Sequence, residues 1–292
     1  MIALPFATAR SGEARTRRTP AFVVSAGWTI LSVGLFAGLW ELAWAAGWAN
    51  PLLLPPPHLF LSNLDRTLSY FSNANRIGAN ASSSGFAGLL MTTLFTTLRV
   101  TVGLAIGFVA GVAVGALVHY VKFARNILMP TLLLLTPISP VAWLPVAIFL
   151  FGIGNTPAIF LVFITIFFAI VLSTATQLEG VNKSFLNVGR IMGANGHQMF
   201  WRVVFPAILP GLFMTLRLNL FAAWMVVLIA EAVGVGSGLG QITSVARSTF
   251  NAQLTFFTMA LIGVLGFSFD WILMQVQRRT LWWTTSGAGG GR

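Results

Sequence analysis

The stretch "NVGRIMGANGHQMFWRVVFPAILP" (residues 187–210) is a polar interruption between two long apolar runs. It carries Arg190, His197 and Arg202 together with three glycines and two prolines, in a chain of which only 8% of the residues are charged. A polar segment between two runs long enough to cross a bilayer is expected to be a loop at one membrane surface. The fold therefore depends on how many such runs the chain contains and on which side this loop lies.

The composition is that of a polytopic membrane protein. The 292 residues are 57% hydrophobic and their mean hydropathy is +0.85. Apolar runs of about 20 residues recur along the chain, and one soluble core could not bury so much apolar surface. Windows of this length predict an all-α membrane protein with six transmembrane helices, at residues 22–46, 91–120, 127–151, 158–177, 211–233 and 254–276.

The basic residues predict the orientation of these helices. With the N-terminus in the cytoplasm, three basic residues (Arg66, Arg76 and Arg247) fall outside, and Arg99 and Arg217 fall within spans. The other 12 lie inside: Arg10, Arg15, Arg17, Arg18, Lys122, Arg125, Lys183, Arg190, Arg202, Arg278, Arg279 and Arg292. The net charge of +11 is therefore mainly a topology signal, and we expect membrane lipid, not nucleic acid, as a partner.

Charge and turn composition divide the sequence into four parts. Residues 1–21 form a basic N-terminal tail, expected in the cytoplasm. Residues 22–90 hold the first predicted helix and a proline-rich, polar external loop. Residues 91–283 hold a five-helix core whose cytoplasmic loop lies near residues 178–210, and residues 284–292 form a glycine-rich tail.

The first predicted helix has a rival interpretation as a cleaved signal peptide. Four arginines precede it, and "AWAAGWA" (residues 43–49) offers small residues at a spacing typical of a cleavage site. Its apolar run is longer than the roughly 7–15 residues of a signal peptide's apolar region. We therefore expect it to be retained as a transmembrane helix.

Four glycines lie on one face of the second predicted helix. They recur every four residues, at Gly103, Gly107, Gly111 and Gly115. This spacing predicts a seam along which another helix packs backbone to backbone. Such a seam would also let the two helices slide between conformations.

Three prolines interrupt the third predicted helix. Pro137, Pro140 and Pro145 stand within the apolar run 127–151, so the helix must kink there and free some carbonyl groups. Such breaks are tolerated only against protein or a water-filled cavity. The segment is either a purely structural kink or a wall of a solute pathway.

Five charged residues within the predicted spans need partners, because charge is costly inside a bilayer. Arg217 and Asp270 each lie about 9 Å above the predicted inner end of their helix, so we expect them to pair. Glu41 and Arg99, near outer ends, form a second candidate pair. Glu231 precedes "GVGSGLG", and its expected partners are backbone amides of that loop or Arg99. These groups either fix helix register or contact solute along a pathway.

The sequence lacks the common motifs of catalysis and of nucleotide binding. It contains no phosphate-binding loop, no H-E-x-x-H and no G-x-S-x-G. It has no cysteine, and its three histidines are scattered, so no metal site is expected. We predict no catalytic residue and no bound cofactor, and this chain alone could not hydrolyse ATP.

The polar loop near residues 178–210 is predicted to hold two short helices. Residues 186–192 can form one helix, Gly193 permits a turn, and residues 197–204 can form a second helix that carries Phe200 and Trp201. Pro206 is expected to end it. The second helix either docks on another protein or lies in the lipid headgroups as an amphipathic helix.

The same loop resembles a family signature. Gly193, nine further residues and then Val203-x-Phe205-Pro206 follow the pattern E-A-A-x3-G-x9-I-x-L-P, with Asn187 and Gly189 in place of its first Glu and last Ala. That signature is found in the transmembrane subunits of binding-protein-dependent ABC importers, where it forms the helix that inserts into a groove of the ATPase subunit. The coupling residues implied by this resemblance are Asn187, Val188, Gly189, Gly193, His197, Phe200, Trp201, Arg202, Val203 and Pro206.

Further segments resemble the nitrate/sulfonate/taurine branch of that family, with features of its nitrate/bicarbonate type. They are "TTLRVTVG", "PVAWLPVAIFLFGIG", "PGLFMTLRLNL", "AEAVGVGSGLG" and "RRTLWW", within about residues 53–283. The resemblance implies a type I importer fold and a permease subunit that imports a small anionic solute by alternating access.

The implied partners are a second permease chain, two ATP-binding subunits that hold ATP and Mg, and a periplasmic or lipid-anchored binding protein. The implied location is the bacterial inner membrane, with both termini in the cytoplasm. Two rival functions remain. A secondary transporter or channel would need no docking helix and often shows inverted repeats, and a membrane enzyme would need a cluster of reactive side chains within its spans.

Overall fold

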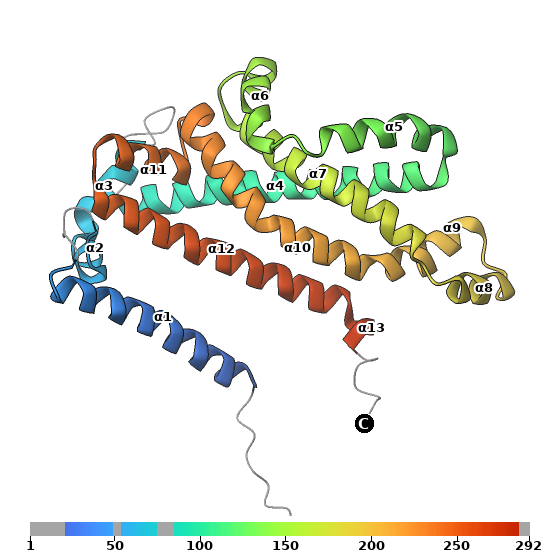
Figure 1. Cartoon of the computed structure of the whole chain (residues 1–292), viewed down its shortest axis with the longest axis horizontal. Coiled ribbons are helices and arrows are strands. Elements are labelled where there is room, and N and C mark those ends of the chain that lie inside the picture. The colour runs from blue at the N-terminus through green and yellow to red at the C-terminus, as the bar shows by residue number, and fades with distance from the viewer. Residues whose placement is uncertain (1–20, 49–53, 75–84, 286–292) are drawn as a thin grey trace, which may run out of the picture. The chain divides into compact units, whose positions relative to one another are not determined.

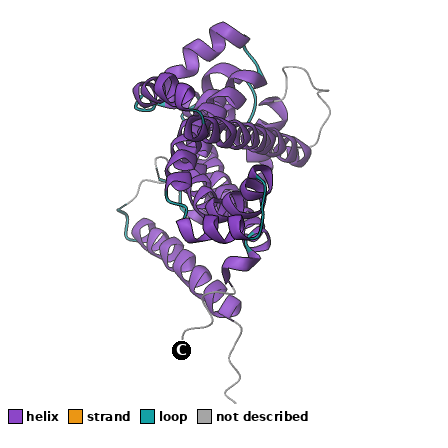
Figure 2. Cartoon of the chain, turned by 90° about the vertical axis from the view of Figure 1, so that its right-hand side faces the viewer, coloured by secondary structure: helices purple, strands orange, loops and turns teal. Residues whose placement is uncertain are grey.

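The structure is a computed structural model that describes residues 21–48, 54–74 and 85–285. Throughout this part of the chain the regular elements are helices, and no strand occurs (Figure 2). The chain divides into two compact units, one ending at His58 and the other beginning at Leu59. The predicted all-α class is confirmed.

The first unit contains the helix α1 (Ala21–Ala45), which matches the first predicted span. Its side chains that the structure describes are mostly exposed and apolar, among them Trp28, Phe36 and Leu42. An apolar helix with an exposed apolar surface is what a lipid-facing span requires. At the end of this unit begins the short helix α2 (Pro57–Ser62).

Three long helices build the core of the second unit: α4 (Gly85–Tyr120), α7 (Asn155–Glu179) and α10 (Phe205–Ala230). Helix α7 packs against both α4 and α10 (Figure 1). Leu161, Ile166 and Ile170 of α7 are fully buried and contact the buried side chains of the other two helices. The central position of α7 explains why its sequence is apolar on nearly every face.

The glycine seam on α4 lies against α7, as predicted. A Cβ atom added at Gly103, Gly111 or Gly115 would lie 2.6, 2.8 or 2.6 Å from the Cβ of Val162, Ile170 or Thr174. At Gly107 it would lie 3.0 Å from the Phe163 carbonyl oxygen. The missing side chains thus allow the two helices to approach backbone to backbone.

The three prolines of the third predicted span mark a sharp break. Helix α5 (Lys122–Leu135) ends just before Pro137, and the chain resumes with the short 3-10 helix η1 (Pro140–Trp143) and α6 (Leu144–Phe151), bent by 99° from α5. Pro140 and Pro145 each stand in the first turn of their helix, where the missing N–H does not remove a helical hydrogen bond. The predicted interruption is confirmed.

Outside the 178–210 loop, the other α-helices are α3 (Leu64–Ala74), α11 (Leu239–Ser248), α12 (Ala252–Thr280) and α13 (Trp282–Thr285). A second apolar cluster joins α3, α11 and the start of α12 through Phe71, Ile242 and Leu254. Little of α12 is fully buried, since only 6% of its most apolar window is, and the other residues of the helix are half-buried or exposed. This long apolar surface requires lipid or another chain to cover it.

The number of spans is compatible with six. In the described part of the chain, four helices are long and apolar enough to cross a membrane, and a fifth span is added if the bent pair of α5 with η1 and α6 counts as one. Helix α1 covers the remaining predicted span. The count of six itself stays a prediction.

Candidate functional site

The 178–210 loop begins with a capped helix and a tight turn. Helix α8 (Lys183–Ile191) starts at Asn182, whose side chain accepts a hydrogen bond of 2.9 Å from the Ser184 N–H. After its end at Ile191, Gly193 has a φ of 75° that reverses the chain, and the Ala194 N–H donates to the Gly189 carbonyl at 3.0 Å. This is a Schellman motif, in which glycine is the favoured residue. The predicted turn at Gly193 is confirmed.

The second half of the loop runs directly into a long helix. Helix α9 (Gly196–Met199) and a π-helical turn, η2 (Phe200–Val204), continue into α10, so the prediction that Pro206 ends the helix is wrong. Pro206 lies in the first turn of α10, directly after η2, where proline is tolerated.

A capping box at the start of α9 was missed by the sequence analysis. The Asn195 side chain caps the helix, and its backbone N–H donates to Gln198 Oε1 at 3.0 Å. An Asn-x-x-Gln spacing before an apolar segment is the sequence signal that could have revealed it.

The two short helices pack through a second glycine. Gly189 is buried, and an added Cβ would lie 2.8 Å from the Met199 sulfur. The family signature has alanine at this position. The glycine found here leaves room for the Met199 side chain and so lets α8 and α9 pack closely. Val203 also lies beside Gly189, since an added Cβ would be 3.6 Å from its Cγ2 atom.

The apolar surface of the loop lies mainly on α8. Ile191 and Met192 are 86% and 80% exposed, and Phe185 and Val188 are also exposed. Their spacing of three, three and one places them on one side of the helix. Trp201, on the segment for which docking was predicted, is half-exposed and packs on Phe205 with ring centroids 5.2 Å apart.

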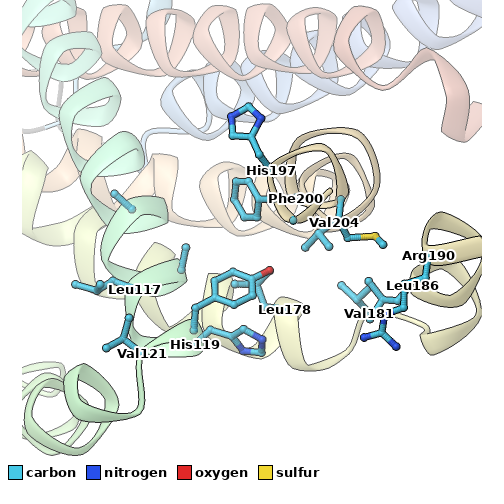
Figure 3. Close-up of a pocket in the computed structure, with 15 residues that line it drawn as sticks. Leu117, His119, Val121, Leu178, Val181, Leu186, Arg190, His197, Phe200 and Val204 are labelled. Atoms are coloured by element: carbon cyan, nitrogen blue, oxygen red, sulfur yellow. The ribbon is translucent and has the colours of Figure 1, made fainter. Parts of the chain in front are cut away.

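A groove of about 540 Å³ separates α8 from the start of α10. Its lining includes Val188, Arg202 and Pro206, together with Trp283 near the end of the described chain. The structure thus brings together five of the predicted coupling residues, since Gly189 and Val203 line the same groove. His197 and Phe200 face a different, larger cavity (Figure 3).

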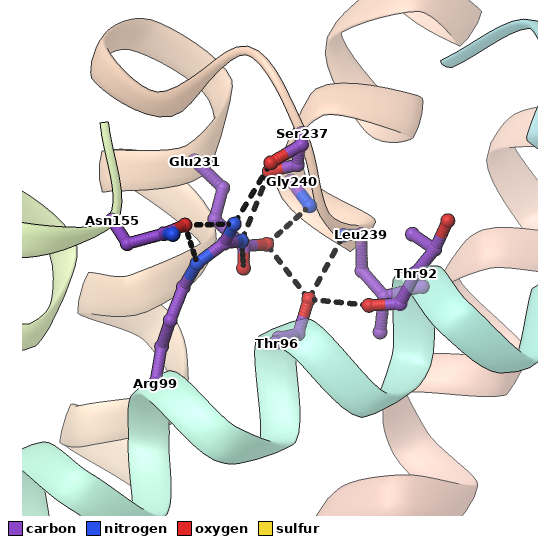
Figure 4. A network of polar contacts seen from close by, with 8 residues as sticks. All are labelled: Thr92, Thr96, Arg99, Asn155, Glu231, Ser237, Leu239 and Gly240. Atoms are coloured by element: carbon purple, nitrogen blue, oxygen red, sulfur yellow. Dashed lines mark hydrogen bonds and ion pairs between the residues drawn. The ribbon is translucent and has the colours of Figure 1, made fainter. Parts of the chain in front are cut away.

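A buried polar cluster lies at the opposite end of the helices, after α10. Arg99 and Glu231 are 4% and 0% exposed, and the Arg99 Nη1 lies 2.6 Å from Glu231 Oε1 (Figure 4). The second carboxylate oxygen accepts from Thr96 Oγ1 at 3.1 Å and from the Gly240 N–H at 3.0 Å. Both partners that the sequence predicted for Glu231, Arg99 and the loop amides, are therefore confirmed.

Arg99 also holds two other segments. Its Nε and Nη2 donate to the Asn155 side chain at 3.0 and 2.6 Å, and Nη2 donates to Ser237 Oγ at 2.8 Å. The cluster thereby joins α4, the first residue of α7, the π-helical turn η3 (Glu231–Val235) and the loop before α11. Asn155 and Ser237 were missed by the sequence analysis, because only the fold brings them beside Arg99.

The predicted pair of Glu41 with Arg99 is wrong. All three guanidinium nitrogens of Arg99 are bonded within the cluster. Glu41 instead accepts from His58, with 2.9 Å between Oε1 and Nδ1. Predicted depth within a span did not identify the partner, because it does not specify which side chains meet after folding.

The predicted pair of Arg217 and Asp270 is present. Arg217 Nε and Nη2 donate to the two carboxylate oxygens of Asp270 at 2.6 and 2.8 Å. The pair joins α10 to α12 and is bidentate, the geometry that favours arginine over lysine. Asp270 is nearly buried, while Arg217 is partly exposed.

The charged and histidine side chains of the described residues do not gather into a larger cluster. No group of three or more His, Cys, Asp or Glu side chains comes together among them. The polar groups that do converge hold one another, as around Arg99. Their arrangement joins neighbouring helices and loops.

Comparison with known proteins identifies the class of protein. The family profile described as "Binding-protein-dependent transport system inner membrane component" matches residues 103–282. The chain belongs to this family, the membrane-embedded permease components of ABC importers.

Named relatives agree with this assignment. The chain is 27% identical to the taurine transport system permease protein TauC of Escherichia coli over 87% of this chain and 89% of that one. It is 31% identical to a probable ABC transporter permease protein of Brucella melitensis, over 58% of this chain and 69% of the relative. It is 30% identical to the nitrate import permease protein NrtB of a Synechocystis strain, over 53% and 57% of the two chains.

A solved structure confirms the fold. The chain resembles an inward-facing structure of the MetNI methionine ABC transporter with a TM-score of 0.57 and 22% identity, over 66% of this chain and 95% of that chain. The all-helical arrangement of type I importer permeases is therefore shared.

Proposed function

We propose that this chain forms the translocation pathway for a small anionic solute in an ATP-driven importer. In this proposal two copies of the permease pair, two separate ATPase subunits bind ATP and Mg, and a periplasmic or lipid-anchored binding protein delivers the solute. Relatives named for taurine transport and for nitrate import support a small solute with an anionic group, since taurine carries a sulfonate and nitrate is an anion.

The observation that carries the coupling part of the proposal is the apolar face of α8. Phe185, Val188 and Ile191 on this helix of nine residues, and Met192 directly after it, are all exposed at the predicted cytoplasmic side. Exposed apolar surface of this kind costs about 25 cal/mol per Å² in water, so it favours a protein partner or lipid. The Schellman turn at Gly193 and the packing of Gly189 on Met199 give this face a defined position, which suits docking into a groove.

The rest of the proposed assembly follows from the family. The buried cluster around Arg99 and Glu231 would lie on the outer side, where the binding protein delivers solute. The bent segment with Pro137, Pro140 and Pro145 is proposed to line the pathway, since a broken helix needs protein or water beside it. Arg278 and Arg279 at the end of α12 favour a cytoplasmic C-terminus.

The test substitutes the apolar face. Ile191→Glu places a charge on the most exposed apolar position of α8 and should abolish retention of the co-expressed ATPase subunit during purification, because a charge buried without a partner is costly. Asn187→Glu is the matched control, since Asn187 is exposed on the same helix and the family signature has Glu there. Membrane insertion of both variants is measured on the same samples.

Each result is informative. Loss of the ATPase in Ile191→Glu with normal insertion, and its retention in Asn187→Glu, would support docking through α8. Full ATPase retention and coupled uptake in both variants would show that this face does not dock. Uptake driven by a solute gradient alone, without ATPase, would favour a secondary transporter or channel.

A further inference from the structure

A cavity of about 790 Å³ lies at the predicted cytoplasmic end of the helices. It opens between the last turns of α4, the end of α7 and the short helices of the 178–210 loop (Figure 3). None of the polar clusters described above reaches it. Its walls therefore combine transmembrane helices with the segment proposed to couple to the ATPase.

Most of the lining side chains are apolar. Leu117 of α4, Leu178 of α7 and Leu186 of α8 contribute to the wall, and Phe200 and Val204 complete it on the side of η2 (Figure 3). An apolar wall offers few hydrogen-bond donors, so it contributes no favourable binding free energy to a small inorganic anion. The occupant that fits this surface has a substantial apolar part.

The polar side chains of the cavity include one arginine and two histidines that lack hydrogen-bond partners among the described residues. Arg190 and His197 line it and are exposed, and neither side chain forms a hydrogen bond or ion pair with any residue that the structure describes. The His119 Nδ1 is buried and also lacks a hydrogen-bond partner there. No carboxylate is among the lining residues. The charge of the cavity complements an anion.

We propose that this cavity binds one anionic phospholipid of the inner leaflet. An acyl chain occupies the apolar wall between Leu117 and Val204, and the headgroup phosphate is held by Arg190 and His197. The position supports lipid over a soluble ligand, because α4 and α7 end at this level and lipid headgroups gather where spans end.

A lipid in this place would also affect coupling. Because it contacts α4 and α7 on one side and α8 and η2 on the other, it would restrict movement of the loop relative to the spans. This regulatory part rests on the proposed function, whereas lipid binding does not.

Binding is tested on the full-length chain, purified with whatever subunits accompany it. Native mass spectrometry after exchange into phosphatidylglycerol or phosphatidylcholine should show a retained phosphatidylglycerol. The double substitution Arg190→Gln with His197→Gln should reduce the preference for phosphatidylglycerol by at least about fivefold, since one arginine near a membrane surface contributes on the order of 1 kcal/mol. Lys183→Gln with Arg202→Gln is the control, because it removes loop cations that do not line the cavity.

A second pair of variants tests the apolar part. Ala116→Phe fills the cavity without changing charge and should displace the lipid, whereas Val109→Phe, on an exposed face of α4 outside the cavity, should not. Equal binding of the two lipids would overturn the proposal, and so would equal loss in both double variants. Binding of inorganic phosphate with an unchanged lipid content would indicate a site for free anions instead.

Lipid binding and coupling are scored separately. Lipid retained by the wild type but lost in Ala116→Phe supports the site whether or not ATP drives uptake. Failure of ATP-driven uptake in the wild type would contradict the proposed function and leave the lipid result standing.

Discussion

Arg99 and Glu231 form an ion pair that water does not reach, and this sets its importance for stability. Removing one member of a buried pair leaves an uncompensated charge, which typically costs about 3–5 kcal/mol. Glu231 also accepts from Thr96 and Gly240, so its loss would free the loop before α11 as well.

We expect Arg99→Ala and Glu231→Ala each to lower the thermal unfolding midpoint of the detergent-solubilised protein sharply. The double variant should lose less than the two single losses combined, because the second change removes the charge that the first one stranded. Arg125→Ala is the control: its partner Glu179 is half-exposed, and such surface pairs contribute about 0–1 kcal/mol. Fully additive losses at Arg99 and Glu231 would contradict the pairing.

Arg217 and Asp270 allow a charge exchange. Arg217→Glu places two acidic groups side by side between α10 and α12, so folded yield and transport should fall. Exchanging both, with Arg217→Asp and Asp270→Arg, should recover part of the loss because opposite charges again meet. Yield by fluorescence-detected size exclusion and uptake by whole cells measure this. A double variant no better than the worse single one would argue against an energetic role of the pair.

At the scale of helices, the glycine seam should be intolerant of side chains. A Cβ at Gly111 would lie 2.8 Å from the Cβ of Ile170 and 3.1 Å from the Phe167 carbonyl oxygen, and backbone atoms cannot move aside cheaply. Gly111→Leu should therefore destabilise the protein by at least about 1–3 kcal/mol. Val109→Leu, on an exposed face of the same helix, should be neutral. Equal thermal midpoints of the two variants would show that α4 and α7 do not pack closely here.

The turn between α8 and α9 depends on backbone conformation alone. Gly193 has a φ of 75°, yet an added Cβ would meet no atom within 4 Å. Gly193→Val should therefore cost about 1–2 kcal/mol through the left-handed conformation and not through a clash. We expect normal membrane insertion but ATP hydrolysis that no longer drives uptake.

Gly196→Val is the matched control for the turn, since Gly196 also has an open surrounding but no positive φ. Uptake measured in parallel with ATP hydrolysis should stay coupled in this variant. Coupled uptake in both variants would mean that the turn is not needed for transmission.

Local sequence patterns predicted most of the helices and turns, but fewer of the contacts in the candidate functional site. Apolar run length, glycine spacing and the turn at Gly193 each depend on neighbouring residues, so they could be read before any fold was known. The partners of Arg99 depend on where Asn155 and Ser237 lie after folding, which no local pattern reports. The helix through Pro206 was missed because the π-helical turn before it is a backbone feature without a clear sequence signal.

At the scale of the whole molecule, the described features fit the mechanism we propose for the assembled importer. Helices α4 and α7 pack closely along the glycine seam. Helix α12 is little buried, so its apolar surface requires lipid or another chain to cover it. In the proposal, ATP-driven closure of the ATPase pair draws the two α8 faces together, and the helices convert this movement into opening toward the outside.

The most direct test of the central claim is uptake by proteoliposomes that contain this chain, its co-expressed ATPase and its binding protein. We predict that uptake of a small solute such as taurine or nitrate requires both ATP and the binding protein, and that binding protein with solute stimulates ATP hydrolysis. Uptake that continues without ATP, or ATP hydrolysis that never responds to the binding protein and its solute, would contradict the assignment of this chain as the coupled permease.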